Sequence, residues 1–265
     1  MTQEDTEAIE RATLAAVAPR AVEELDGWLL PFDSGTVGRA KSAVPLRHEA
    51  PADAAGLAEW IGQRYAAQGL RAAFRIADLA CFDALHVALQ ERGCQRGKPT
   101  LTQTGDLRAL LALAPGAPGD VDTAPDAGWA SVFLGEGFDP VDGESRVQAL
   151  SRAAGTLFGS VREDGRTVAA GAMALGHGWA SLHGMRTEQS AWGRGLAGRV
   201  MAGLARAALA RGYQRVFLQV EAGNAPALAL YRRAGFTSQW TYEYWTQDPV
   251  GTHVGATPGA ELTGR

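Results

Sequence analysis

The sequence has 265 residues, of which 46% are hydrophobic and 20% are charged, an ordinary composition for a globular chain with a sizeable core. Its length predicts one large domain or two small ones. The 25 lysine and arginine residues against 29 aspartate and glutamate residues give a net charge of −4, which excludes a general nucleic-acid or anionic-membrane binder.

Two cysteines without a CxxC pair, and five histidines without ligand spacing, exclude a disulfide scaffold and a zinc ribbon. We therefore expect no metal. The first residues are acidic and lack the basic stretch and apolar run of a secretion signal, and the apolar runs are too short to span a bilayer. These features predict a cytoplasmic protein with no membrane partner, while nothing in the sequence indicates its oligomeric state.

A change of composition divides the chain. Residues 114–128 contain many turn formers, few large aliphatic side chains and no periodic pattern, which is typical of a linker or a long surface loop. We expect an N-terminal α+β domain over residues 1–113, a second domain over 129–250 and a flexible tail over 251–265.

The front half predicts the order α-β-β-α-β-α-β. Helical spacing covers residues 4–25, 53–68 and 82–92, and strand patterns cover 27–32, 39–46, 72–77 and 98–104. None of these segments carries a motif that specifies a chemical reaction.

The back half predicts a helix, three antiparallel strands, and then helix, strand, helix and strand. The first helix covers residues 144–154, and the antiparallel strands cover 156–162, 167–175 and 179–187, the first two joined by the hairpin signal Glu163-Asp164-Gly165-Arg166. A packed helix over 196–210, a strand over 215–221, a short capped helix and an aromatic strand over 239–245 follow.

A glycine-rich turn, Trp192-Gly193-Arg194-Gly195-Leu196-Ala197-Gly198, connects the third antiparallel strand to the packed helix. Two glycines allow close approach of a ligand, and the helix N-terminus offers unpaired N–H groups to a pyrophosphate, with Arg194 as a further contact. The spacing also matches a dinucleotide fingerprint, but the hairpin-linked strands and the short remaining chain disfavour a doubly wound sheet. Taken alone, a turn without any ligand is an equally good interpretation.

A second motif runs from Asn224 to Phe236 and describes a complete short helix. Asn224 suits the N-cap, Pro226 the first turn and Gly235 the left-handed position after the last turn. Together with the glycine turn, this helix resembles the GNAT superfamily of acyl-CoA-dependent N-acetyltransferases. The resemblance covers about residues 131–245, with Trp192 at a position where the family has Gln or Arg.

The resemblance implies a mixed, mostly antiparallel sheet with helices on both faces, preceded by a smaller α+β domain that we interpret as a degenerate GNAT-like copy unable to bind coenzyme A. It implies transfer of an acetyl group from acetyl-CoA to a primary amine, with a small-molecule or peptide acceptor. It places the coenzyme-binding residues at Met185, Arg186, Thr187, Trp192, Gly193, Arg194, Gly195, Leu196, Ala197, Asn224 and Tyr231.

The resemblance makes Tyr231 the candidate general acid for the departing thiolate, and a core-filling aromatic is the alternative interpretation. Glu221 and His183 are equally ranked candidates for the base that accepts the amine proton, and a water relay would need neither. For Asn224 a helix cap is the simpler interpretation, and a cap is compatible with a contact to the coenzyme as well. A non-catalytic acyl-CoA-binding or interaction module is the second hypothesis for the whole chain, and a dinucleotide oxidoreductase is the third.

Overall fold

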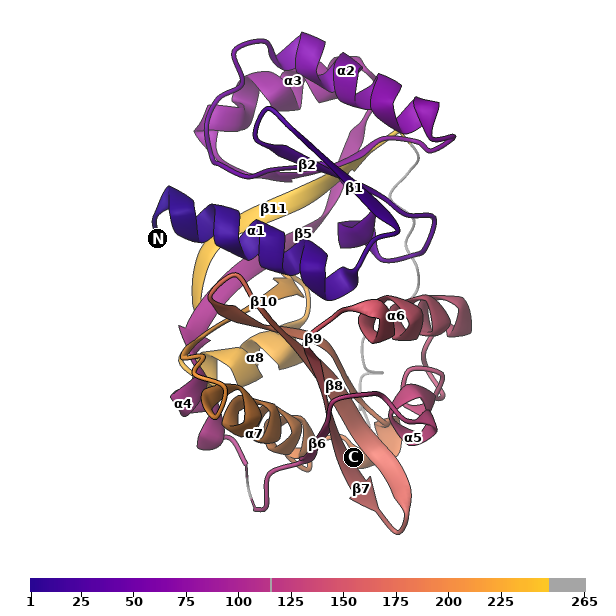
Figure 1. Cartoon of the computed structure of the whole chain (residues 1–265), viewed down its shortest axis with the longest axis vertical. Coiled ribbons are helices and arrows are strands. Elements are labelled where there is room, and N and C mark those ends of the chain that lie inside the picture. The colour runs from indigo at the N-terminus through magenta and orange to yellow at the C-terminus, as the bar shows by residue number, and fades with distance from the viewer. Residues whose placement is uncertain (115, 248–265) are drawn as a thin grey trace, which may run out of the picture.

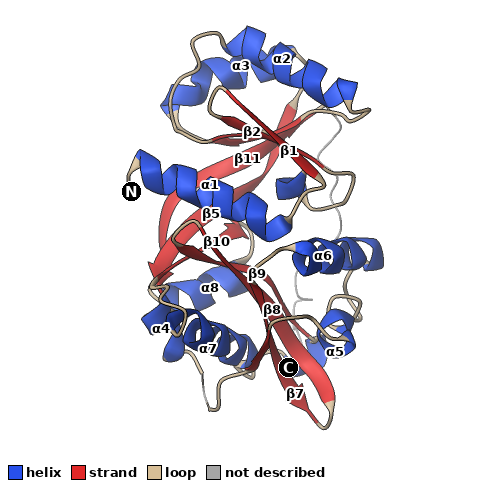
Figure 2. Cartoon of the chain, viewed as in Figure 1, coloured by secondary structure: helices blue, strands red, loops and turns tan. Residues whose placement is uncertain are grey.

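A computed structural model describes residues 1–114 and 116–247 of the chain. It contains a three-stranded sheet and an eight-stranded mixed sheet with helices on both faces (Figures 1 and 2). The expected tail over residues 251–265 lies outside the described residues. In the described part of the chain, no helix combines the length and the apolar character needed to cross a bilayer.

The front half begins with a helix whose N-terminus is fixed by a capping box between Thr2 and Asp5. Its helices are α1 (Gln3–Val17), α2 (Ala54–Ala67), α3 (Asp83–Glu91) and α4 (Leu107–Leu111), with 3-10 turns η1 (Gly38–Ala40) and η2 (Ala80–Phe82). Its strands are β1 (Ala21–Leu25), β2 (Trp28–Phe32), β3 (Val44–Pro45), β4 (Ala73–Ala77) and β5 (Gln95–Asp106).

The back half follows the order that the sequence predicts, with additions at its start. Its helices are α5 (Ala127–Ser131), α6 (Pro140–Arg152), the 3-10 turn η3 (Gln189–Ala191), α7 (Leu196–Leu209) and α8 (Ala225–Arg233). Its strands are β6 (Asp120–Asp122), β7 (Thr156–Glu163), β8 (Arg166–Gly176), β9 (Trp179–Thr187), β10 (Arg215–Glu221) and β11 (Thr237–Thr246).

Three expectations about local structure were wrong. Residues 4–25 are not one helix: α1 ends at Val17, Ala18 adopts a left-handed backbone, Pro19 follows, and the chain continues as β1. Residues 39–46 form η1 and a two-residue strand instead of a full strand. The expected linker is partly ordered structure, because residues 120–122 form β6 against β7 and α5 begins before residue 128.

The large sheet has the strand order β4-β11-β5-β10-β9-β8-β7-β6. All neighbouring pairs are antiparallel except β9 and β10, so the predicted mixed, mostly antiparallel sheet is confirmed. Strand β5 of the front half lies between β10 and β11 of the back half, and the long ribbons of β5 and β11 run together through both halves (Figure 1). The two halves therefore share one sheet.

Separate apolar clusters cover the two faces of this sheet. On one face, α4, α7 and α8 pack against β7–β10, with Val200 and Leu204 of α7 fully buried. On the other face, α5 and α6 cover β7 and β8 through residues such as Trp129 of α5 and Leu150 of α6. Trp179 and Phe217 of β9 and β10 lie in the cluster formed by α1–α3, β4 and β11, which joins the halves on that face.

Candidate active site

The central strands β9 and β10 separate within the sheet. They pair in parallel at only three positions, residues 180–182 against 216–218. Beyond these positions β9 pairs with β8 alone, at residues 183, 186 and 187, and residues 219–221 pair with β5 alone. The separation leaves the β10-facing backbone of residues 183–187 without a strand partner, which is an edge to which an extended ligand can add.

A bulge sits at the start of this separated segment. The register of β9 against β8 shifts between Ala170 and Ala172, and Gly184 adopts a positive φ of 59°. A Cβ at Gly171 would meet the Met185 sulfur at 2.3 Å, which shows that the Met185 side chain packs back over β8 on the α7 face. Arg186 points to the α6 face, where its guanidinium lies 3.8 Å from Asp142.

The glycine turn follows β9 and η3. Gly193 and Gly195 have φ values of 76° and 74°, a left-handed conformation that explains both glycines. Gly195 is the N-cap of α7 and supplies no side-chain cap, so the first N–H groups of the helix remain available to an anion. This backbone fits a pyrophosphate.

The side chains of the turn have partners of their own. Trp192 is 59% exposed, and its indole N–H donates to the Thr187 carbonyl at 2.8 Å. Arg194 forms an ion pair with Glu163 at 2.8 Å. The turn therefore offers backbone N–H donors, whereas Arg194, the expected charged contact, is paired with Glu163 of β7.

The α8 motif forms as the sequence predicts. The side chain of Asn224 accepts a hydrogen bond from the Ala227 amide at 3.2 Å, which is the helix-cap interpretation. Tyr231 is only 7% exposed and its ring lies 5.7 Å from the Phe236 ring. Burial raises the pKa of the Tyr231 phenol to about 12, so the hydroxyl stays protonated at physiological pH.

The two candidate bases differ in their surroundings. His183 is 4% exposed, and neither ring nitrogen has a hydrogen-bond partner. Burial, with a smaller effect of Arg39, holds the pKa of His183 well below its ordinary value, so the imidazole is neutral and weakly basic. Glu221 is exposed at the end of β10, beyond the last position where β10 pairs with β9.

Front-half and α6 residues that the sequence did not single out complete this face. Arg39 of η1 donates to Gln219 at 3.3 Å, Thr36 donates to Asp142 at 2.8 Å, and Arg146 contacts Asp142 at 2.6 Å. No local motif marks these residues, because packing of the front half on the sheet brings them together.

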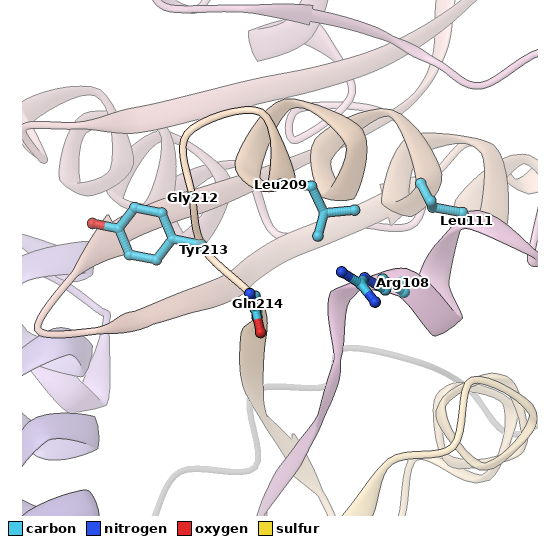
Figure 3. Close-up of a pocket in the computed structure, with 6 residues that line it drawn as sticks. All are labelled: Arg108, Leu111, Leu209, Gly212, Tyr213 and Gln214. Carbon is cyan, nitrogen blue, oxygen red and sulfur yellow. The ribbon is translucent and has the colours of Figure 1, made fainter.

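Other features lie away from this region or form no site. A hollow lies at the C-terminal end of α7 (Figure 3). The glycine turn is at the other end of this helix. It is lined by Arg108, Leu111, Leu209, Gly212, Tyr213 and Gln214. Within residues 1–114 and 116–247, no three His, Cys, Asp or Glu side chains are grouped so as to hold a metal ion.

The model of a family described as "Probable histone acetyltransferase Rv0428c C-terminal" matches residues 4–245. The chain belongs to this family. No curated protein matches it.

Solved structures with the same fold include a GCN5-related N-acetyltransferase from Kribbella flavida, with 20% identity, a TM-score of 0.67 and coverage of 94% of this chain and 97% of that one. A conserved protein of unknown function from Staphylococcus epidermidis has 12% identity and a TM-score of 0.66, covering 88% and 96%. A tandem GNAT protein from the clavulanic acid biosynthesis pathway has 15% identity and a TM-score of 0.57, covering 93% and 97%. The GNAT fold expected from the two motifs is thus confirmed.

Proposed function

We propose that this family member is an acyltransferase that moves an acetyl group from acetyl-CoA to a primary amine by direct attack in a ternary complex. The observation that carries the proposal is the separation of β9 from β10 immediately before an uncapped, glycine-lined helix N-terminus. An extended arm adding to residues 185–187 would lead from this turn toward the gap between the two strands.

We assign the binding roles on the basis of this geometry. The backbone of Met185, Arg186 and Thr187 pairs with the pantetheine arm, and the turn from Trp192 to Ala197 holds the pyrophosphate through its N–H groups. Asn224 caps α8 and thereby fixes the start of the helix that carries Tyr231. An N–H of the separated β9 segment also faces the thioester oxygen as it gains charge.

The chemical roles divide between Glu221 and Tyr231. The amine nitrogen bonds to the thioester carbon, the carbon–sulfur bond breaks, and its electron pair leaves with the sulfur. Glu221 takes the proton that the nitrogen loses, because His183 is buried and weakly basic. Tyr231 donates a hydrogen bond to the departing thiolate, which takes one proton from solvent to become the thiol, while Glu221 returns its proton to solvent.

Full proton transfer from Tyr231 to the thiolate costs more free energy than a hydrogen bond from the neutral phenol. A phenol with a pKa of about 12 is roughly 3.5 units above an ordinary thiol, so complete transfer costs about 5 kcal/mol. A hydrogen bond from the neutral phenol stabilises the developing charge without this cost.

Calorimetric titration with acetyl-CoA, followed by a thiol-release assay over a panel of amines, tests the proposal. Gly195→Asp places a carboxylate beside the pyrophosphate, whereas Gly195→Asn introduces a side chain of similar shape without the charge. Charge repulsion over a few ångströms predicts roughly tenfold weaker binding or more for the Asp variant than for the Asn variant. Equal affinities would place the pyrophosphate elsewhere.

The same assay distinguishes the acyltransferase from a non-catalytic acyl-CoA-binding module. That alternative is favoured by Trp192, which replaces a polar side chain of the resembled motif and whose indole N–H occupies the Thr187 carbonyl. Acetyl-CoA binding without thiol release for any amine would support the module.

A further inference from the structure

Three arginines from different elements gather on the α6 face beside the gap between β9 and β10. They are Arg39 of η1, Arg146 of α6 and Arg186 of β9. Thr36, three residues before Arg39, ties the front-half loop to α6 through hydrogen bonds to Asp142 and Ser145. Three segments that are distant in sequence therefore meet at one place.

The strand residues on this face show how the arginines are arranged. Gln219, which accepts from Arg39, and Glu221 lie two residues apart on β10 and so share a face. The bulge at Gly184 turns Arg186 to the same side, since Arg186 contacts Asp142 of α6 and lies over the Phe138 ring at 4.3 Å. Arg39 and Arg186 thus approach the same gap from its two strands.

The positive charge of this group exceeds the negative charge around it. The Asp142 carboxylate contacts two guanidinium groups, that of Arg146 at 2.6 Å and that of Arg186 at 3.8 Å. It also accepts a hydrogen bond from the Thr36 hydroxyl. Glu221 is the second carboxylate that acts on Arg186. Arg39 has the neutral Gln219 as its hydrogen-bond partner and, in the described chain, no carboxylate within 4.0 Å. Three guanidinium groups against two carboxylates leave one positive charge uncompensated.

Burial is the main influence on the pKa of Arg186. Burial, and after it the neighbouring Arg146, lower the pKa of Arg186 to about 10, against the opposing effects of Asp142 and Glu221. The guanidinium remains charged at neutral pH. A half-buried cation with incomplete compensation favours an incoming anion, which forms charge-assisted hydrogen bonds in a medium of low dielectric.

Unpartnered polar atoms line the adjoining strands. They are Thr102 Oγ1, Gln219 Nε2 and both ring nitrogens of His183, all buried and without hydrogen-bond partners. Thr102 is paired with Gln219 in the register of β5 and β10, and positions 183 and 219 are the first ones after the last β9–β10 pair, Leu182 with Leu218. Buried polar groups are ordinarily hydrogen-bonded, so this row points to polar groups of a ligand or to water carried with it.

We propose that the acceptor is an amine that also carries a carboxylate, which binds between Arg39 and Arg186 while the amine faces Glu221. This inference rests on the proposed acetyl transfer. The carboxylate completes the charge balance of the arginine group. The ammonium form of the amine is attracted to Glu221 and releases its first proton to solvent, so that the neutral amine attacks and Glu221 takes the second proton. The chemical class is that of the amino acids, in which amine and carboxylate are separated by few bonds.

The first experiment compares amino acids with their amides as acceptors for the full chain at saturating acetyl-CoA. We expect kcat/KM to be at least about tenfold higher for the acids. Arg186→Gln and Arg39→Gln should raise KM for the acids about ten- to a hundredfold, the range for losing a hydrogen bond to a charged group. In Arg39→Gln, KM for the amides and the affinity for acetyl-CoA should change little. Arg186→Lys should be affected less than Arg186→Gln, because it keeps the charge.

Arg166→Gln is the matched control. Arg166 is an exposed arginine of β8 and is paired with Glu188, which follows the last residue of β9. It should leave both classes of acceptor unchanged. Equal kcat/KM for acids and amides, or an equal loss for both in Arg186→Gln, would overturn the inference and leave the acetyltransferase proposal intact.

A second measurement does not depend on turnover. N-acetylamino acids and their amides are titrated into the protein with coenzyme A, and preferential binding of the acids that is lost in Arg186→Gln supports the carboxylate site. Binding of acids and amides alike contradicts it. Failure to bind acetyl-CoA at all would instead overturn the proposed function.

Discussion

Tyr231 is the residue whose surroundings bear most directly on the proposed chemistry. It is almost fully buried against Phe236, and its hydroxyl remains protonated because burial raises its pKa to about 12. A group that is always protonated in the physiological range acts as a permanent hydrogen-bond donor. Its contribution should therefore appear in turnover and not in coenzyme affinity.

Tyr231→Phe should lower kcat roughly ten- to a hundredfold, the loss expected when a hydrogen bond to a developing charge is removed. Acetyl-CoA affinity, measured by calorimetry, should stay within about twofold, since the ring and its packing are kept. Tyr213→Phe, in the hollow at the other end of α7, is the control and should leave kcat unchanged. An unchanged kcat in Tyr231→Phe would remove the phenol from the mechanism.

A buried ion pair links α1 to β4. Arg75 is fully buried and Glu10 nearly so, and the two side chains are in direct hydrogen-bond contact. The Tyr242 ring lies 5.0 Å from the guanidinium, while Arg75 Nε and Nη1 have no partner. Such a pair is costly to break from one side, because the remaining charge has no compensation.

Glu10→Ala should therefore lower the free energy of unfolding by about 3–5 kcal/mol. The double variant Glu10→Leu with Arg75→Met replaces both charges by apolar groups and should be more stable than the single variant. Urea unfolding of the three proteins measures this. A single variant as stable as the double one would show that the pair makes no such contribution.

At the scale of elements, two glycines of α7 allow close contact with the backbone of Leu113 and of Gly119. A Cβ at Gly198 would meet the Leu113 carbonyl oxygen at 2.4 Å, and one at Gly203 would meet the Gly119 carbonyl oxygen at 2.3 Å. The Gly119 amide also donates to the Arg199 carbonyl at 2.8 Å. Gly198, the third glycine of the apparent dinucleotide fingerprint, thus has a packing role.

Gly203→Ala should destabilise the protein by about 1–3 kcal/mol, because the added methyl group must displace the backbone at Gly119. Gly62→Ala makes the same exchange within helix α2, where nothing lies within 4 Å of the new Cβ. That variant should gain up to about 1 kcal/mol from helix propensity. Comparing the melting temperatures of the two variants separates the steric clash at position 203 from the effect of helix propensity. If both substitutions shifted the melting temperature in the same direction, the packing role of Gly203 would be contradicted.

The sequence predicted the back-half elements because each has a local signal: a hairpin turn before Arg166, the glycines at 193 and 195, and the Asn224 cap. It mispredicted residues 21–25, where acidic and apolar residues fit both a helix and a strand. It also missed the arginine group of the candidate site. Arg39 and Asp142 are brought together through Thr36 by tertiary packing, which leaves no spacing that can be read along the chain.

At the scale of the whole molecule, the division into domains at residues 113 and 129 stays a prediction. Strands from both sides of this division belong to one sheet. Strand β5 pairs with β10 over seven positions and with β11 over eight, so it holds the last strand of the back half in place. Trp179 and Phe217 add apolar contacts to the front-half cluster. Independent folding of the back half would leave the neighbouring edges of β10 and β11 without a strand between them.

Residues 114–265 expressed alone should therefore aggregate or lack a cooperative unfolding transition, because unpaired strand edges and newly exposed apolar surface favour association. Coexpression with residues 1–113 as a separate chain should restore a soluble one-to-one complex, since β5 then regains its place between β10 and β11. Size-exclusion chromatography and thermal unfolding followed by circular dichroism measure both outcomes. A monomeric 114–265 fragment that unfolds cooperatively would show that the back half needs neither β5 nor the front-half cluster to fold.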